Sequence, residues 1–348
     1  MMAIAHTHKG NALLVAVALL VTAPLFAKTA QAQNKVGTSA AAFLGIATDA
    51  RAAAMGSAQV AVEGGPNAVH WNPAALARIG GSGVDFLRAD WFVDSQYHHV
   101  AAGIQTPVAH IGISVMVLDY GEMEVTTIAN PEGTGELFNP QDLAVGVTIA
   151  RDITNRFSAG ATVKYVQQRI WNEKAGGTGL DLGVFYQAGV RNLRIGMSMS
   201  NFGSDMALSG KDLRRAIDID PNIEGNNPRL GAELETDEWP MPLIFRVGLA
   251  LDPWTTDSQR LTLSVDAIHP NDQAESASFG FEYAFHEFFF VRGGYRQAFS
   301  DVVDDGGLTG GFGLAYRVSN TVTAHFDYVF QDYGDLGTPQ MWTLGATF

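Results

Sequence analysis

The chain has 348 residues, 22 basic and 36 acidic, and a formal net charge of −14 at pH 7. This charge argues against nucleic-acid binding, because phosphates need Lys and Arg. The absence of cysteine excludes disulfides, thiolate metal sites and a cysteine nucleophile. Only 17% of residues are charged and 38 are glycine, a composition that suits a membrane β-barrel better than a water-soluble domain.

Residues 1–32 have the features of a secretory signal peptide. Lys9 precedes an apolar run over 12–27, and the run is followed by Ala30-Gln31-Ala32, a small-x-small cleavage pattern. The alternative is a transmembrane anchor, but a spanning helix needs about 18–20 apolar residues and this run is shorter. We expect cleavage near Ala32, which leaves 20 basic and 36 acidic residues and a net charge of 20 − 36 = −16.

Residues 33–82 do not alternate between polar and apolar side chains. The stretch 40–55 has the spacing of a small-residue amphipathic helix, and Gly64-Gly65-Pro66 and Asn72-Pro73 then break the chain. The segment is too apolar for a floppy tail. We expect it to fold as a plug within the structure that the rest of the chain forms.

Period-two alternation bounded by turn residues recurs along residues 83–348. Ile111, Ile113, Val115 and Val117 form one such apolar face, with small or polar residues between them. Segments of about ten residues match tilted membrane-spanning strands. The predicted strands are residues 83–91, 97–106, 109–119, 141–151, 156–168, 178–187, 192–201, 243–252, 259–268, 275–285, 287–297, 308–317, 321–331 and 340–348.

The connections between these segments alternate in length. Those after even-numbered strands are short and those after odd-numbered strands are mostly longer, including 120–140, 169–177 and 202–242. Outer-membrane barrels have short periplasmic turns and long outer loops, whereas a soluble sandwich has no reason to sort its loops this way. The sequence therefore predicts an all-β membrane protein, a 14-stranded antiparallel transmembrane β-barrel over 83–348 with an N-terminal, partly helical plug. Fourteen strands enclose a lumen that side chains alone cannot fill, which gives the plug a purpose.

The last predicted strand runs to the final residue. Trp342, Leu344 and Phe348 share one face of it. A barrel benefits from such an ending, because its last strand must pair with its first and leave no edge. A C-terminal aromatic strand also resembles the signal by which bacterial outer-membrane barrels are recognised for insertion. We therefore expect the bacterial outer membrane as the location.

Two stretches within residues 42–77 resemble known families. Ala42-Phe43-Leu44-Gly45-Ile46, Asp49-Ala50-Arg51 and Ala54-Met55-Gly56-Ser57-Ala58 resemble the N-terminal signature of the PorV/PorQ family. Trp71-Asn72-Pro73-Ala74-Ala75-Leu76-Ala77 resembles an Asn-Pro-Ala element of FadL-like fatty-acid channels. Between them, the two resemblances rest on the motif residues Phe43, Leu44, Arg51, Met55, Gly56, Trp71, Asn72 and Pro73.

The resemblance implies a FadL-like barrel that serves the type IX secretion system. For a PorV-like member it implies binding of the C-terminal domains of secreted cargo, which are then passed to a complex that anchors them to lipopolysaccharide. For a PorQ-like member it implies that the protein holds an attachment-complex partner at the cell surface. The implied partners are cargo C-terminal domains, other type IX components and outer-membrane lipid.

Cargo binding would use the outer loops, where a secreted domain emerges. Loop 202–242 is far longer than ordinary connections, which favours a function or disorder, and loop 120–140 is the second candidate. A β-domain could dock on either loop by edge pairing; the alternative is a solvated lid. The apolar candidates are Met206, Leu208, Leu213 and Ile217 in the first loop, and Met123, Leu137 and Phe138 in the second.

Arg51 is the charge of interest in the plug. It either meets a ligand carboxylate in the lumen or pairs with a lumen acid such as Asp181, and the second role is favoured because an enclosed charge needs a partner. Trp71 and Pro73 are expected to pack the plug.

Enzymatic chemistry finds little support. His98 and His99 are adjacent, so on a strand they face opposite sides and cannot share one metal. No dinucleotide fingerprint, nucleophile elbow or zinc-binding helix motif is present, and we expect no catalytic, cofactor or metal site. The alternative function is a FadL-like channel for hydrophobic small molecules, which needs an apolar lumen pocket and a lateral gap. The third possibility is a structural porin-like protein, but the expected plug argues against it.

Overall fold

The computed structural model describes residues 37–190, 192–218, 229–299 and 306–348. The expected signal peptide and its cleavage site lie outside these residues. No helix in the described part of the chain is long and apolar enough to cross a bilayer.

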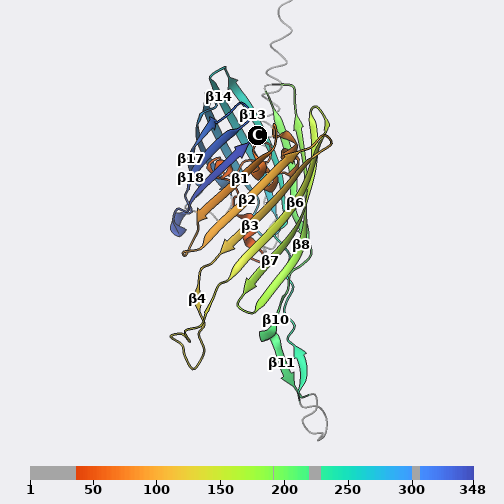
Figure 1. The fold of residues 1–348 in the computed structure, drawn as a ribbon, viewed down its shortest axis with the longest axis vertical. Coiled ribbons are helices and arrows are strands. Elements are labelled where there is room, and N and C mark those ends of the chain that lie inside the picture. Colours follow the sequence, from red (N-terminus) through yellow and green to blue (C-terminus); the bar gives the residue numbers. More distant parts are fainter. Residues whose placement is uncertain (1–36, 191, 219–228, 300–305) are drawn as a thin grey trace, which may run out of the picture. The chain divides into compact units, whose positions relative to one another are not determined.

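Fourteen strands of the described chain close into one antiparallel ring (Figure 1). Neighbours along the chain pair with each other, β1 pairs with β19, and β8 pairs with β9. The predicted 14-stranded barrel is confirmed, and nearly all strand ends fall within three residues of those predicted. The strands are β1 (Gly83–Asp90), β2 (Gln96–Gln105), β3 (His110–Asp119), β6 (Gln141–Thr154), β7 (Phe157–Ile170), β8 (Glu173–Gln187), β9 (Arg194–Gly203), β13 (Ile244–Thr255), β14 (Gln259–Pro270), β15 (Ser276–Phe285), β16 (Phe289–Ala298), β17 (Leu308–Arg317), β18 (Thr323–Gln331) and β19 (Gln340–Thr347).

The barrel carries apolar side chains on its outside and polar ones on its inside. On β3, Ile111 and Ile113 are 44% and 54% exposed, whereas Ser114 faces inward and is buried. Along the other strands, buried inward positions include Thr148, Asp266 and Glu282. Water would penalise this arrangement and a bilayer favours it. The apolar face predicted for 111–117 is the outer face.

Additional short strands lie beyond the ends of the barrel strands, on the side of the long connections (Figure 1). A small hairpin joins β4 (Met123–Glu124) and β5 (Leu137–Phe138), and another joins β11 (Arg214–Ile217) and β12 (Leu230–Glu233). Strand β10 (Leu208–Gly210) pairs with the first residues of β8. Loop 202–242 is therefore partly ordered β-structure.

The expectation of a loop over 169–177 is wrong. Strands β7 and β8 continue through this stretch and turn at Trp171 and Asn172, where Ile170 pairs with Glu173. Trp171 has a φ of 53°, the left-handed conformation that tight two-residue hairpins require. The extended hairpin leaves an edge on β8 with which β10 pairs.

Residues 37–82 form short helical turns and no continuous helix. The turns are η2 (Ala42–Gly45), α2 (Ala50–Ala54), η3 (Pro66–His70) and η4 (Pro73–Arg78). The expected helix over 40–55 is wrong, because Ile46 is extended and Asp49 restarts the chain as an N-cap that accepts a hydrogen bond from the Arg51 amide at 3.0 Å.

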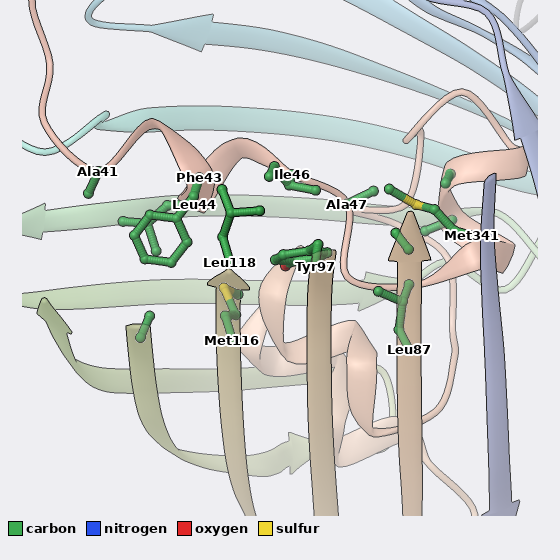
Figure 2. Close-up of a cluster of buried hydrophobic side chains, with 14 of the residues drawn as sticks. Ala41, Phe43, Leu44, Ile46, Ala47, Leu87, Tyr97, Met116, Leu118 and Met341 are labelled. Carbon is green, nitrogen blue, oxygen red and sulfur yellow. The ribbon is translucent and has the colours of Figure 1, made fainter. Parts of the chain in front are cut away.

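This N-terminal segment lies inside the ring. Helix α2 contacts β16, β17, β18 and β19, whereas η4 contacts β3, β6, β7 and β8 on the opposite wall. Figure 2 shows Phe43 and Leu44 of the segment in one cluster of buried side chains with Tyr97 and Leu118 of the strands. The lumen is filled by the chain's own N-terminal segment.

Placing Arg at position 115 tests which side of β3 meets lipid. Val115 pairs with Val100 and Val145 and points outward, so Val115→Arg should lower the free energy of unfolding by about 2–4 kcal/mol near mid-bilayer. The measurement is urea unfolding of protein refolded into lipid vesicles. Ile128→Arg, at a fully exposed residue of loop 120–140, is the control and should change little. Equal stability of the two variants would contradict a lipid-facing Val115.

Candidate functional site

Glycines on the inner wall let the backbone of the N-terminal segment lie directly against the strands. A Cβ atom at Gly196 would overlap the carbonyl oxygen of Val60, and one at Gly280 would overlap that of Met55. At Gly160 it would lie 2.6 Å from the carbonyl carbon of Pro73. Only glycine permits these close approaches, so the wall and the segment fit each other at backbone level.

Asn72 links parts of the segment to each other and to the wall. Its side-chain amide donates to the carbonyl oxygens of Val60 at 2.9 Å and Val184 at 3.0 Å, while Oδ1 accepts from the Ala74 amide at 3.0 Å. Trp71 beside it is buried and lies under the guanidinium of Arg246, 5.5 Å from the ring centroid. The structure thus places Trp71, Asn72 and Pro73 of the predicted motif in packing positions.

The other motif residues are also enclosed. Phe43 and Leu44 belong to the main buried cluster. Met55 is fully buried, and Gly56 has a φ of 64° with its amide donating to the hydroxyl of Thr309 at 3.0 Å. The motif therefore positions the segment rather than presenting side chains to solvent.

Arg51 joins the segment to the barrel by an ion pair with a fully buried carboxylate. Its Nε and Nη2 donate to Glu282 at 2.8 and 3.1 Å, and Nη1 donates to the carbonyl of Glu63 at 2.8 Å. Burial would lower the pKa of Arg51, but the charge of Glu282 raises it above its ordinary value. The expected partner Asp181 is wrong: Asp181 pairs with Lys164 at 2.7 Å, because strand register decides which acids share a level in the lumen.

Glu282 is the centre of a larger cluster of charges. Arg292 donates to it at 2.7 Å and Arg260 at 3.0 Å, and Arg292 also pairs with Asp327. The nearby Asp49 has its pKa raised to about 6, chiefly by burial and further by Asp327 and Asp85. Three guanidinium groups around one carboxylate give Glu282 the compensation that a buried charge needs.

His70 at the end of η3 is half-buried, in edge contact with Trp71 at 5.0 Å between ring centroids. Burial and the charge of Arg246 hold its pKa well below the ordinary value, so the ring is neutral. No group of three or more His, Asp or Glu residues suited to a metal occurs among the described residues.

The predicted loop residues fall into two groups. Leu208 and Ile217 are exposed on β10 and β11, and Met123 and Leu137 are exposed on the β4–β5 hairpin. Phe138 packs edge-on against Trp171, with 5.2 Å between ring centroids. The exposed members form an apolar outer surface.

Two predicted loop residues are covered. Met206 is 1% exposed and forms a β-bridge with Trp239, so its assignment to a partner-binding surface is wrong: it packs in the main buried cluster. Leu213 is half-buried in the short turn η5 (Lys211–Leu213), and its carbonyl accepts from the Leu234 amide at 2.9 Å. Their apolar character serves the folding of the loop.

Sequence reasoning missed three exposed apolar side chains of the same loop. Leu230, Leu234 and Trp239 are each more than two-fifths exposed. Leu230 pairs with Ile217 across the β11–β12 hairpin. The alternation of Leu230, Ala232 and Leu234 was the signal that could have revealed this strand.

The C-terminal residue completes the closure of the barrel. The amide of Phe348 donates to the carbonyl of Ser82 at 2.8 Å, and the amide of Ser82 donates back at 2.9 Å. Leu344 and Phe348 are exposed on the outer face, and Trp342 packs against Phe86 with 5.5 Å between ring centroids. A role of Trp342, Leu344 and Phe348 as an insertion signal stays a prediction.

An apolar exterior, a polar lumen and a closed ring of antiparallel strands define an outer-membrane β-barrel. Solved structures share its fold: the toluene transporter TbuX of Ralstonia pickettii is 14% identical, with a TM-score of 0.52 over 86% of this chain and 96% of that chain. The CymD monoaromatic hydrocarbon channel is 13% identical, with a TM-score of 0.55 over 86% and 97%. A FadL homologue of Pseudomonas aeruginosa is 13% identical, with a TM-score of 0.50 over 86% and 98%.

The family is shown by sequence. The family model described as "Type IX secretion system protein PorV" matches residues 29–208, which is just over half of the chain. The chain belongs to the PorV family. No curated protein matches the sequence.

A side chain at Gly196 tests the fit between wall and segment. Gly196→Val should displace the segment from β9, because the new Cβ meets the Val60 carbonyl, and the emptied lumen should conduct ions. The measurement is single-channel conductance in planar bilayers. Gly231→Val is the control, because a Cβ atom at position 231 would meet no atom of the described chain within 4 Å. Unchanged conductance at position 196 would show that the segment tolerates the side chain.

Removing the charge of Arg51 tests its part in holding the segment. Arg51→Met keeps the length of the side chain and leaves Glu282 with fewer partners, so stability should fall by about 3 kcal/mol. Denaturant unfolding of the refolded protein in detergent measures the change. Arg88→Met is the control, because the side chain of Arg88 is 42% exposed and lies 3.7 Å from the exposed Asp90, where an ion pair contributes little. A loss no greater than that of the control would contradict an anchoring role.

Proposed function

We propose that this protein is a type IX secretion component of the outer membrane that binds the C-terminal domains of secreted cargo on its outer loops. One observation carries the proposal: the described part of loop 202–242 forms ordered β-structure with exposed apolar side chains. Strands β11 and β12 form a two-stranded sheet, so each has an edge without a strand partner among the described residues. Such edges accept a further strand through backbone hydrogen bonds.

The chemistry of this surface fits a protein partner. Leu208, Ile217, Leu230, Leu234 and Trp239 add apolar area to the strand edges. In strand addition the main-chain hydrogen bonds supply affinity and the side chains beside the edge supply specificity. Trp239 is of the residue type that often dominates the binding energy of protein interfaces. A β-rich cargo domain presents a strand that can pair with these edges and side chains that can pack on this apolar surface. In this proposal the signal peptide is cleaved near Ala32, and the bound cargo is passed on for attachment to lipopolysaccharide.

A PorQ-like variant of the proposal assigns the same surface to an attachment-complex partner. The cargo-binding role and the PorQ-like role use the same surface chemistry, so the identity of the captured protein distinguishes them. Both are non-enzymatic roles that need the barrel as a membrane anchor.

The second candidate is a channel for hydrophobic small molecules. The names of the fold neighbours, a toluene transporter and a monoaromatic hydrocarbon channel, favour it. The filled lumen disfavours it, because α2 and η4 contact opposite walls and the segment is almost wholly buried.

Charges on the β11–β12 hairpin test cargo binding. The double variant Ile217→Asp, Leu230→Asp should reduce recovery of cargo at least tenfold, because two apolar side chains of about 1.5–3 kcal/mol each lose their contact. The measurement is pull-down of the native protein from gently solubilised membranes, with quantitative mass spectrometry of co-purifying chains. Leu336→Asp, an exposed apolar residue of another outer loop, is the control.

The identity of the recovered material decides between the alternatives. Surface proteins that share a C-terminal β-domain, lost in the double variant, support cargo binding. Recovery of an attachment-complex protein alone supports the PorQ-like role. Equal recovery by the double variant and the control removes the hairpin from the mechanism, and fatty or aromatic small molecules without protein partners favour the channel.

A further inference from the structure

A cavity of about 120 Å³ lies between the N-terminal segment and the ends of β13, β14, β15, β16 and β18. These are the strand ends that carry the longer connections, so the cavity is on the outer side of the barrel. Gly45 and Gln273 at its lining are exposed to solvent, whereas Trp71 and Arg246 are buried. The cavity is thus reachable from outside and has a built interior.

Arg246 is the most enclosed charge of this cavity. Its exposure is 5%, and it contacts the hydroxyl of Ser200 through a long hydrogen bond from Nη1 at 3.4 Å and the ring of Trp71 through its guanidinium face. Its Nε has no hydrogen-bond partner within the described chain. No carboxylate of the described residues lies within ion-pair distance of Arg246, and a buried guanidinium without such a partner is costly.

A second guanidinium lines the same cavity. The guanidinium carbon of Arg296 lies 3.8 Å from the centroid of the Tyr333 ring. Arg296 also has no ion-pair partner in the described part of the chain. Among the described residues of the lining, Asp272 is the only acidic one, and its carboxylate accepts a hydrogen bond from Ser39. The lining therefore holds two positive charges against one negative charge.

The rest of the barrel treats its buried cations differently. Arg51 and Arg292 share Glu282, Lys164 pairs with Asp181 at 2.7 Å, and Arg194 pairs with Asp252 at 2.6 Å. Each of these cations has a carboxylate within hydrogen-bond distance. At both arginines of the cavity no carboxylate of the described residues comes within ion-pair distance. The acids that act on Arg246, Asp266 and Asp181, lie farther away, and Asp181 is already paired with Lys164. The cavity therefore has guanidinium groups whose donors no carboxylate occupies.

We propose that this cavity binds an oxyanion, a carboxylate or phosphate group, that enters from the outer side. Arg246 and Arg296 supply charge-assisted hydrogen bonds to such a group. Ala47, Ile244 and Ile268 in the same lining accommodate a short apolar body attached to it. The site takes a charged ligand, unlike a pocket built for neutral hydrocarbons, and it is independent of cargo binding on the outer loops.

Binding of simple anions tests the site. Sodium butyrate, sodium acetate and inorganic phosphate are titrated by isothermal calorimetry into the refolded, full-length barrel in a non-ionic detergent, at constant ionic strength set with chloride. Saturable binding with about one site per chain is expected for butyrate or phosphate. The comparison of butyrate, acetate and phosphate tells an apolar carboxylate ligand from a phosphate group. If the heat measured on titration of these anions equals the heat measured on titration of sodium chloride, the proposal is overturned.

Two variants and one control connect binding to the cavity. Arg246→Gln and Arg296→Gln should each weaken binding at least tenfold, whereas Arg88→Gln, at a half-buried arginine of β1 outside the cavity, should bind as the parent protein does. Heat-modifiable migration in gels verifies that each variant is folded. Because Arg296 lies at the edge of the cavity, its variant keeps the test valid if Arg246→Gln fails to fold. Equal affinity of a folded Arg296→Gln variant and the control overturns the assignment.

Discussion

Closure of the backbone hydrogen-bond ring is the constraint on which this structure depends. In a bilayer no water is available for an unpaired strand edge, so every strand needs a partner on both sides. The pairings of β1 with β19 and β8 with β9 complete the ring. The hydrogen bonds between Ser82 and Phe348 extend the first of these pairings to the last residue. Apolar side chains then face lipid, and the polar residues are left to the lumen.

A ring of this size creates a second requirement, because its lumen is wider than side chains can fill. The N-terminal segment meets it with short turns rather than one helix, and these turns reach opposite walls. Glycines such as Gly160, Gly196 and Gly280 allow its backbone to approach the strands. Arg51 then places a charge on the buried Glu282. The close backbone contacts and this ion pair together hold the segment in the lumen, which is the space that an open channel would need.

The outer side of the protein has two distinct chemical surfaces. The β10–β12 extension exposes leucine, isoleucine and tryptophan side chains beside strand edges that have no partner among the described residues, which suits a β-rich protein partner. The cavity next to Trp71 is small, enclosed and rich in donors, which suits a small anion. The first surface is the one used in the proposed cargo binding, and the second is a feature of how this lumen distributes its charges.

The sequence by itself determined the class of fold. Alternation in 83–348 predicted every barrel strand, since period two is a local property that each strand carries on its own. The motif of residues 42–77 predicted the family. Local pattern failed where the structure depends on partners. Strands β7 and β8 continue through 169–177 because they pair with each other. Residues 40–55 do not form one helix, because Ile46 is extended and Asp49 caps a new turn.

Only the tertiary structure decided which distant residues meet. Arg51 pairs with Glu282 and not with Asp181, because strand register sets the height of each side chain in the lumen. Met206 is buried rather than exposed, because its loop folds back and pairs with Trp239. The arginines of the outer cavity, 50 residues apart in the sequence (296 − 246), share one lining for the same reason. Local periodicity fixes strands and their faces, whereas contacts between strands follow from closure and register, which no short stretch of sequence contains.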